Sequence, residues 1–206
     1  MRKSKALLWD VGGVILSNGW DDTSRGLAVG RFNLDRVEFE RRHQAVFAAF
    51  EEGRMTLDAY LDQTVFYRLQ PFSKQDFNSF IFAQSKENEE VRAILDELTA
   101  TDRCFQATIN NEGLELNNYR IREFDLARNF SVFFSSCYLG LRKPDEAIYR
   151  KALDITQRAA EGCVFIDDRL PNVEGARRVG MRGIHFQSPA QLRAELEQYG
   201  VAVVGS

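Results

Sequence analysis

The chain has few of the residues that build common zinc, disulfide and serine hydrolase sites. Its 206 residues include three cysteines and two histidines. Cys104, Cys137 and Cys163 are odd in number and widely spaced, a pattern typical of reduced, buried thiols and not of a disulfide framework. No C-x-x-C, H-E-x-x-H or G-x-S-x-G motif occurs, which excludes the usual zinc sites and the nucleophile elbow of Ser-His-Asp hydrolases. Any metal here is therefore expected to be a hard cation held by carboxylates.

Long apolar runs and a surplus of positive charge are also missing. No stretch approaches the roughly 18 apolar residues of a membrane span, and the apolar residues after the basic start reach Asp10 too early for a signal peptide. The chain carries 27 basic and 30 acidic residues, a formal net charge of −3, which argues against a nucleic-acid partner. We expect a cytoplasmic globular protein with no membrane or nucleic-acid partner. The sequence leaves its oligomeric state open.

The order of apolar and amphipathic segments predicts an α/β fold. Residues 6–9 are an apolar run that stops at Asp10 and Gly12-Gly13, as in a buried parallel strand followed by a tight loop. After residue 87, expected strands alternate with expected helices. The strands are 104–109, 131–135, 163–166 and 183–186; the helices are 89–98, 114–126, 145–153, 172–179 and 189–199. This alternation indicates right-handed crossovers and a Rossmann-like parallel sheet.

The segment between the first strand and residue 85 has helical periodicity and no strand signals. Helices are expected at 37–50, 56–67 and 74–84. We therefore assign 17–85 to an all-helical cap, and 1–16 with 86–206 to the α/β core. Because ligands of open α/β sheets bind at the carboxyl ends of the strands, a cap inserted there is expected to lie over the ligand crevice.

Polar residues stand at the expected carboxyl ends of the strands. Carboxylates such as Asp10 and Asp168 are hard oxygen ligands suited to Mg²⁺, which often also contacts a substrate phosphate. A lysine such as Lys143 is a compact charge suited to a phosphoryl oxygen. The alternative is that strand-end acids only cap the next helix, and for Asp167 and Asp168 alone that reading is equally open. Taken together, these positions favour a combined cation and anion site.

These residues give the chain a resemblance to the haloacid dehalogenase-like hydrolase superfamily over nearly its whole length. Four stretches resemble the four motifs of that family in their order, and they read LLWDVGGVI from Leu7, ATINNE from Ala107, GLRKPD from Gly140 and CVFIDD from Cys163, with Asn172 following. The helical insert matches the family's first-position (C1-type) cap. The D-x-G-G-V first motif is similar to sugar-phosphate phosphatases and to the phosphatase domain attached to soluble epoxide hydrolases.

The resemblance implies a Mg²⁺-dependent hydrolase of small phosphorylated metabolites. Asp10 would attack phosphorus and form an aspartyl-phosphate, and Lys143 would pair with both Asp10 and the transferred group. Mg²⁺ would be held by Asp10, the carbonyl of Gly12 and Asp168. The remaining roles are phosphate binding by Asn110 and Asn111 beside Lys143, and orientation of Asp168 or Lys143 by Asp167.

Two positions depart from the family pattern. Gly12 stands where most phosphatases of the family carry a general acid and base, and Asn110 stands where a Ser or Thr is usual. General acid–base help is worth roughly 10²–10⁴-fold in rate, so we expect a preference for substrates with leaving groups of low pKa. An acid from elsewhere would relieve that preference, and Asp21, Asp22 and Glu112 are the candidates.

Other readings follow from the same departures. One alternative is a catalytically weak phosphate-binding or phospho-acceptor module. Another is a metal-independent 2-haloacid dehalogenase, although those relatives resemble Asp-x-Tyr-Gly-Thr and this chain has Asp-x-Gly-Gly-Val. Away from the strand ends, Arg41, Arg42 and His43 are expected to form a solvated helix face, and His185 to be structural.

Overall fold

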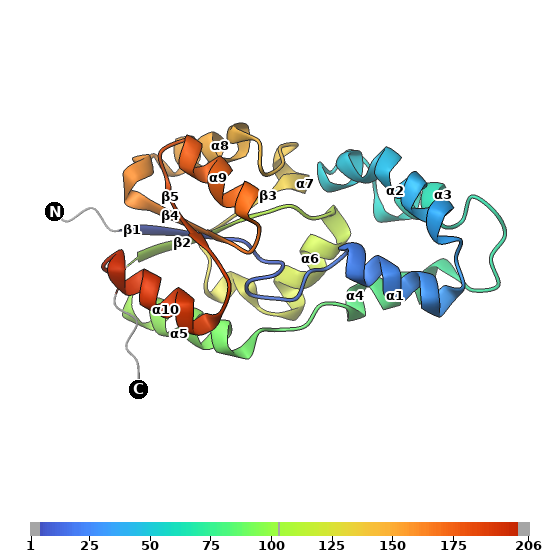
Figure 1. Ribbon diagram of the computed structural model, residues 1–206, viewed down its shortest axis with the longest axis horizontal. Helices are drawn as coiled ribbons and strands as arrows, with labels where there is room; N and C mark the ends of the chain where they lie inside the picture. Colours follow the sequence, from blue (N-terminus) through green and yellow to red (C-terminus); the bar gives the residue numbers. More distant parts are fainter. Residues whose placement is uncertain (1–4, 103, 202–206) are drawn as a thin grey trace.

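A five-stranded parallel sheet forms the centre of the protein, as the sequence predicts (Figure 1). The computed structural model describes residues 5–102 and 104–201, so positions 1–4, 103 and 202–206 of the predicted core domain lie outside the described residues. The strand order is β3-β2-β1-β4-β5. The strands are β1 (Lys5–Trp9), β2 (Cys104–Asn110), β3 (Val132–Ser135), β4 (Cys163–Asp167) and β5 (Arg182–His185).

The central strand β1 is buried on both faces because its side chains alternate between two hydrophobic layers. Leu7 and Trp9 pack in one layer, which α5 (Glu89–Thr101) and α10 (Pro189–Gln198) cover. Ala6 and Leu8 pack in the other, under α8 (Glu146–Thr156) and α9 (Leu170–Arg178). The other elements described after β2 are α6 (Leu114–Glu123), α7 (Ser136–Leu139) and the short 3₁₀ helices η1 (Leu126–Arg128) and η2 (Ala160–Gly162).

Four helices between β1 and α5 build most of a third hydrophobic cluster, to which Leu116 of α6 also belongs. Figure 1 places them beyond the carboxyl ends of the strands. They are α1 (Asp22–Phe32), α2 (Arg36–Glu51), α3 (Leu57–Thr64) and α4 (Lys74–Ala83). Phe39, Phe50, Tyr60 and Phe77 are buried in this cluster, so the aromatic residues of the segment are mostly its core. The limits proposed for a separate cap domain stay a prediction.

The chain enters and leaves this helical segment at adjacent points. Leu16 pairs with Glu87 in an antiparallel bridge, and the Ser17 amide donates to the Lys86 carbonyl at 2.7 Å. The Ser17 hydroxyl also donates to the carbonyl of Gln84 at 2.7 Å. The two connections therefore run side by side at the edge of the sheet where the strands end. Within the described residues, no helix is long and apolar enough to cross a membrane.

Candidate functional site

The centre of the site is the Lys143 ammonium, which lies between two aspartates. Its Nζ is 2.8 Å from Asp10 Oδ1 and 2.6 Å from Asp167 Oδ2. Asp10 follows β1 and Asp167 ends β4, two strands that pair directly, so the sheet itself fixes the spacing of the carboxylates. All three side chains are buried, with exposed fractions of 7%, 0% and 4% for Asp10, Asp167 and Lys143. A buried charge needs a partner, and here one cation serves two anions.

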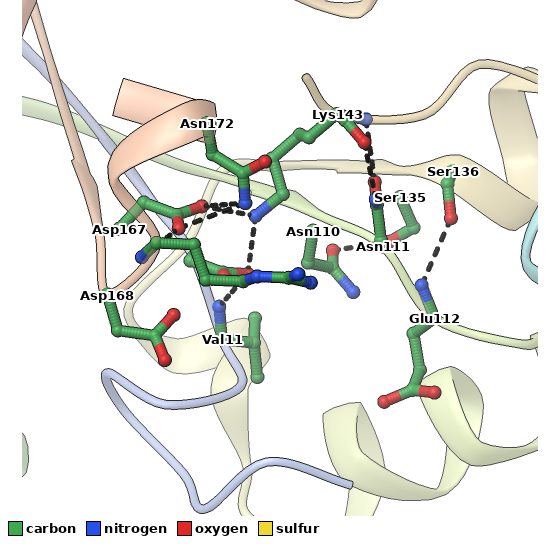
Figure 2. A network of polar contacts seen from close by, with 12 residues as sticks. Val11, Asn110, Asn111, Glu112, Ser135, Ser136, Lys143, Asp167, Asp168 and Asn172 are labelled. Atoms are coloured by element: carbon green, nitrogen blue, oxygen red, sulfur yellow. Dashed lines mark hydrogen bonds and ion pairs between the residues drawn. The ribbon is translucent and has the colours of Figure 1, made fainter. Parts of the chain in front are cut away.

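The Asp167 carboxylate is hydrogen-bonded through both of its oxygens. Asp167 Oδ1 accepts from the Arg169 amide at 2.8 Å, and both carboxylate oxygens accept from Asn172 Nδ2 at 3.0 Å. Figure 2 shows Lys143 and Asn172 reaching this carboxylate together. Asp167 thus contacts Lys143, Arg169 and Asn172, and its role in orienting Asp168 or Lys143 stays a prediction.

Burial and charge act in opposite directions on this group of residues. Burial raises the pKa of Asp10 well above its ordinary value, against the attraction of the Lys143 ammonium. Burial lowers the pKa of Lys143, but the neighbouring Asp10 and Asp167 carboxylates outweigh it and raise that pKa. Lys143 is therefore a permanent cation at neutral pH. The Lys143 ammonium can attract an anion, and additional positive charge would stabilise the ionised form of Asp10. The site is therefore suited to an anion and a metal cation together.

Asp168 adds a third carboxylate to this site. Ligand oxygens of Asp10, Asp167 and Asp168 all lie within 4.8 Å of one another. Asp168 Oδ1 is buried and makes no hydrogen bond within the described part of the chain. Burial and the adjacent Asp167 raise the pKa of Asp168. An unpartnered buried carboxylate oxygen beside two further carboxylates is the donor set that a hard divalent cation requires.

Gly13 makes the approach of Asp168 possible. Its φ is +78°, and a Cβ at this position would lie 2.2 Å from Asp168 Oδ2. The His185 ring also helps to define the loop, because its Nε2 lies 3.0 Å from the Asp168 carbonyl oxygen. His185 thus has the structural role expected from the sequence.

The two asparagines at the carboxyl end of β2 form hydrogen bonds around the site. Asn111 bridges the backbone of Lys143: its Nδ2 donates to the Lys143 carbonyl and its Oδ1 accepts from the Lys143 amide, each at 2.9 Å (Figure 2). Asn110 donates from Nδ2 to Asn117 Oδ1 at 3.0 Å and accepts from the Ser135 hydroxyl at 2.9 Å. Asn111 therefore orients the lysine loop and also lines the cavity described next.

A cavity of about 520 Å³ opens above these residues. Asp10, Lys143 and Asp168 line its sheet side, and Trp20, His43 and Phe50 line the side formed by the helical segment. The prediction of a solvated face at Arg41, Arg42 and His43 is wrong for His43, which is 6% exposed. Its ring packs against Phe47 of the same helix and against Tyr60 of α3, and the contact with α3 turns it inward.

The His43 ring ends a chain of hydrogen bonds with Trp20 and Tyr60. Trp20 Nε1 can only donate, and it donates to the Tyr60 hydroxyl at 2.8 Å. The same hydroxyl lies 2.8 Å from His43 Nδ1. Burial, with the Arg25 charge as a smaller cause, lowers the pKa of His43 to about 3. A neutral His43 therefore places an uncharged polar ring on the wall of the cavity.

Two arginines that line the cavity are matched by carboxylates. Arg25 Nε lies 3.0 Å from Glu40 Oε1, and Arg142 Nη2 lies 2.6 Å from Glu51 Oε2. Lys143, at the sheet side of the same cavity, is paired with Asp10 and Asp167.

Of the three candidate replacement acids, the structure buries one. Asp21 caps α1 by accepting from the Ser24 amide and hydroxyl at 2.8 Å, and the Asp22 side chain is 75% exposed. Glu112 is 7% exposed, lines the cavity and lies 3.2 Å from Arg120 Nη1 through its Oε2. Glu112 is thus the acid whose surroundings differ most from water.

Comparison with known proteins assigns a family to these features. The profile of haloacid dehalogenase-like hydrolases matches residues 4–180. The chain is 26% identical over 200 residues to drimenol cyclase drtB of Aspergillus calidoustus. The matched region covers 93% of this chain and 36% of that protein. It is 28% identical over 166 residues to flavin mononucleotide hydrolase 1 of Arabidopsis thaliana, which covers 80% of this chain and 66% of that one. The chain thus spans between about a third and two thirds of the length of these relatives.

A solved structure with the same fold comes from Bacteroides thetaiotaomicron. The crystal structure of its HAD family enzyme bt-2542 superposes with a TM-score of 0.76 at 16% identity, covering 89% of this chain and 93% of that one. A second structure of that enzyme, a complex with magnesium and inorganic phosphate, superposes with a TM-score of 0.71 at 17% identity, covering 89% of this chain and 94% of that one.

Proposed function

The chain belongs to the haloacid dehalogenase-like hydrolase family, and we propose that it is a Mg²⁺-dependent phosphomonoesterase of small phosphorylated metabolites. The observation that carries the proposal is the Lys143 ammonium held between Asp10 and Asp167 at the base of the cavity. Among the relatives, a flavin mononucleotide hydrolase and a sesquiterpene phosphatase of Aspergillus oryzae, 38% identical over 76 residues and covering 37% of each chain, support hydrolysis of a phosphate ester. The cytoplasmic location expected from the sequence stays a prediction.

Asp10 is the nucleophile in this proposal. Its Oδ1 accepts from the Val11 amide and from Lys143, each at 2.8 Å, which directs Oδ2 to the incoming phosphorus. Attack forms an aspartyl-phosphate, which water then hydrolyses, so one difficult displacement becomes two easier ones. Lys143 holds a phosphoryl oxygen and balances the charge that builds up during transfer. Asn111 keeps Lys143 in place, and Asn110 would reach a phosphoryl oxygen by exchanging its bond to Asn117.

The carboxylates of this chain fit a magnesium ion. Asp10, the Gly12 carbonyl and Asp168 would hold it, and the unpartnered Asp168 Oδ1 is the observation that favours this set. When bound, the ion supplies positive charge that keeps the carboxylates ionised and neutralises phosphoryl oxygens. The His43, Trp20 and Phe50 rings would receive the organic part of the substrate on the opposite wall.

A phosphate-release screen over phosphorylated metabolites tests the proposal. The wild type is assayed with and without Mg²⁺, with Asp10→Asn as the blank. We expect release that requires both Mg²⁺ and Asp10. No release from any compound would favour the phosphate-binding or phospho-acceptor module, which the departures at Gly12 and Asn110 suggest. Halide release from 2-haloacids without Mg²⁺ would instead favour the dehalogenase.

A further inference from the structure

Arg120, which is ion-paired to Glu112, borders the space beside Gly12. A Cβ added to Gly12 would lie 3.4 Å from Arg120 Nη1 and 3.2 Å from Asn18 Oδ1. The same Arg120 Nη1 is 3.2 Å from Glu112 Oε2. A Cβ on Gly19 would lie 2.8 Å from Glu112 Oε2, so both glycines leave room for the pair. The Arg120 guanidinium thus lies between Gly12, which has no carboxylate, and Glu112, which has one.

Arg120 is a fixed support for Glu112. It is 3% exposed, and it donates from Nε to the Ser85 hydroxyl at 3.0 Å and from Nη2 to the Ser17 carbonyl at 2.8 Å. The Gly113 amide donates to Glu112 Oε1 at 3.2 Å. At its backbone, the Glu112 amide donates to the Ser136 hydroxyl at 3.0 Å (Figure 2). The carboxyl group is therefore placed on a cavity wall by contacts from several elements, as a reacting group requires.

The charges around Glu112 leave it able to exchange a proton near neutrality. Arg120 of α6 lies against it, Glu51 of α2 acts on it through space, and the Cys137 thiol of α7 is a third titratable neighbour. Burial raises the pKa of Glu112 to about 7, while Arg120 opposes the rise and the negative charge of Glu51 adds to it. A general acid and base works best when its pKa is near the working pH.

We propose that Glu112 is the general acid and base of this enzyme, in the place that Gly12 leaves open, and that Arg120 is its positioning residue. This inference rests on the proposed phosphomonoesterase function. In the first step, an Asp10 oxygen bonds to phosphorus and the bond from phosphorus to the ester oxygen breaks. The ester oxygen keeps the electron pair and takes the Glu112 proton, so the leaving group departs as an alcohol.

The second step restores both residues. A water oxygen bonds to the phosphorus of the aspartyl-phosphate, the ionised Glu112 takes one proton of that water, and the bond from phosphorus to Asp10 breaks. Phosphate leaves, Asp10 is again a carboxylate and Glu112 is again protonated. Proton donation by Glu112 therefore weakens the preference of the wild type for leaving groups of low pKa. A variant without the Glu112 carboxyl group should show that preference in full.

The test compares the wild type and Glu112→Gln on aryl and alkyl phosphates of rising leaving-group pKa, in the presence of Mg²⁺. Glu123→Gln, on the exposed end of α6, is the matched control. We expect Glu112→Gln to lower kcat/KM about 10²–10⁴-fold on alkyl phosphates, where proton donation matters most. On dinitrophenyl phosphate it should release a burst of about one equivalent of phenol and then turn over slowly, because departure needs no acid but the second step lacks its base.

The pH profile is an independent measurement. On an alkyl phosphate, the wild-type kcat/KM should fall as pH rises through about 7, because the protonated form of Glu112 is the donor. Glu112→Gln should lack this limb, Glu112→Asp should partly restore it, and Arg120→Gln should move it to higher pH because the opposing cation is gone. Circular dichroism checks that each variant is folded.

Failure of the inference and failure of the proposed function give different results. If the wild type releases no phosphate, or if Asp10→Asn is as active as the wild type, the proposed function fails. If the wild type is active and Asp10→Asn is not, but a folded Glu112→Gln keeps the wild-type leaving-group dependence and pH limb, then Glu112 is not the acid and base while the function stands.

Discussion

His43→Asn should remove part of the acid sensitivity of this protein. The asparagine keeps an amide near the position of Nδ1 to bond the Tyr60 hydroxyl, but it has no titrating ring. In the wild type, His43 has a pKa of about 3 in the folded state, against about 6.5 in an unfolded chain. The unfolded state therefore binds a proton that the folded state does not, so this residue makes stability fall as pH decreases from about 6.5 to about 3.

The magnitude follows from the two pKa values. Between pH 7 and pH 5 the neutral His43 costs the wild type about 2 kcal/mol of unfolding free energy, and His43→Asn does not incur this loss. Urea unfolding of both proteins at both pH values measures it, because the pH-independent cost of the substitution cancels in the difference between the two losses. Equal losses in the two proteins would refute the buried, neutral state of His43.

Two further predictions concern the charged site. Lys143→Met leaves Asp10 and Asp167 buried without their cation, so the unfolding free energy at pH 7 should fall by about 3–5 kcal/mol, and by less at pH 4, where the carboxylates take up protons; a denaturant titration giving equal losses at both pH values would contradict this. Gly13→Ala should weaken Mg²⁺ binding at least about tenfold in calorimetry because its Cβ overlaps Asp168, a loss worth about 1.4 kcal/mol. Gly140→Ala, at φ +65° with open space around its Cβ, is the matched control, and an equal effect there would show that backbone strain alone is responsible.

The sequence predicts the sheet and much of the site because both follow from local patterns. Short apolar runs bounded by polar residues identify the strands, and all five observed strands overlap the expected ones. Parallel strands place their carboxyl ends at one edge, so Asp10, Asp167 and Asp168 meet there without any knowledge of side-chain contacts. The expected pairing of Asp10 with Lys143 is also present in the structure, at 2.8 Å.

The remaining features depend on contacts between distant segments. Helix α1 has Gly26 and Gly30 and few apolar residues, so its sequence gives little helical signal; Asp21 caps it and Ala28 packs in the aromatic cluster. His43 follows two arginines on α2 and is turned inward only by Tyr60 of α3. The partner of Asn110 is Asn117, one helix further along, and no spacing rule predicts that pair.

Arg120 joins the two connections through which the chain enters and leaves α1–α4, because it donates to Ser17 in one and to Ser85 in the other. A rotation of these four helices about the two connections would have to stretch or break one of these bonds. The Arg120 guanidinium therefore resists such a rotation. The third bond of that guanidinium goes to Glu112. Any opening that broke the bonds of Arg120 would therefore be coupled to the protonation of Glu112, and each change would shift the other by the same free energy.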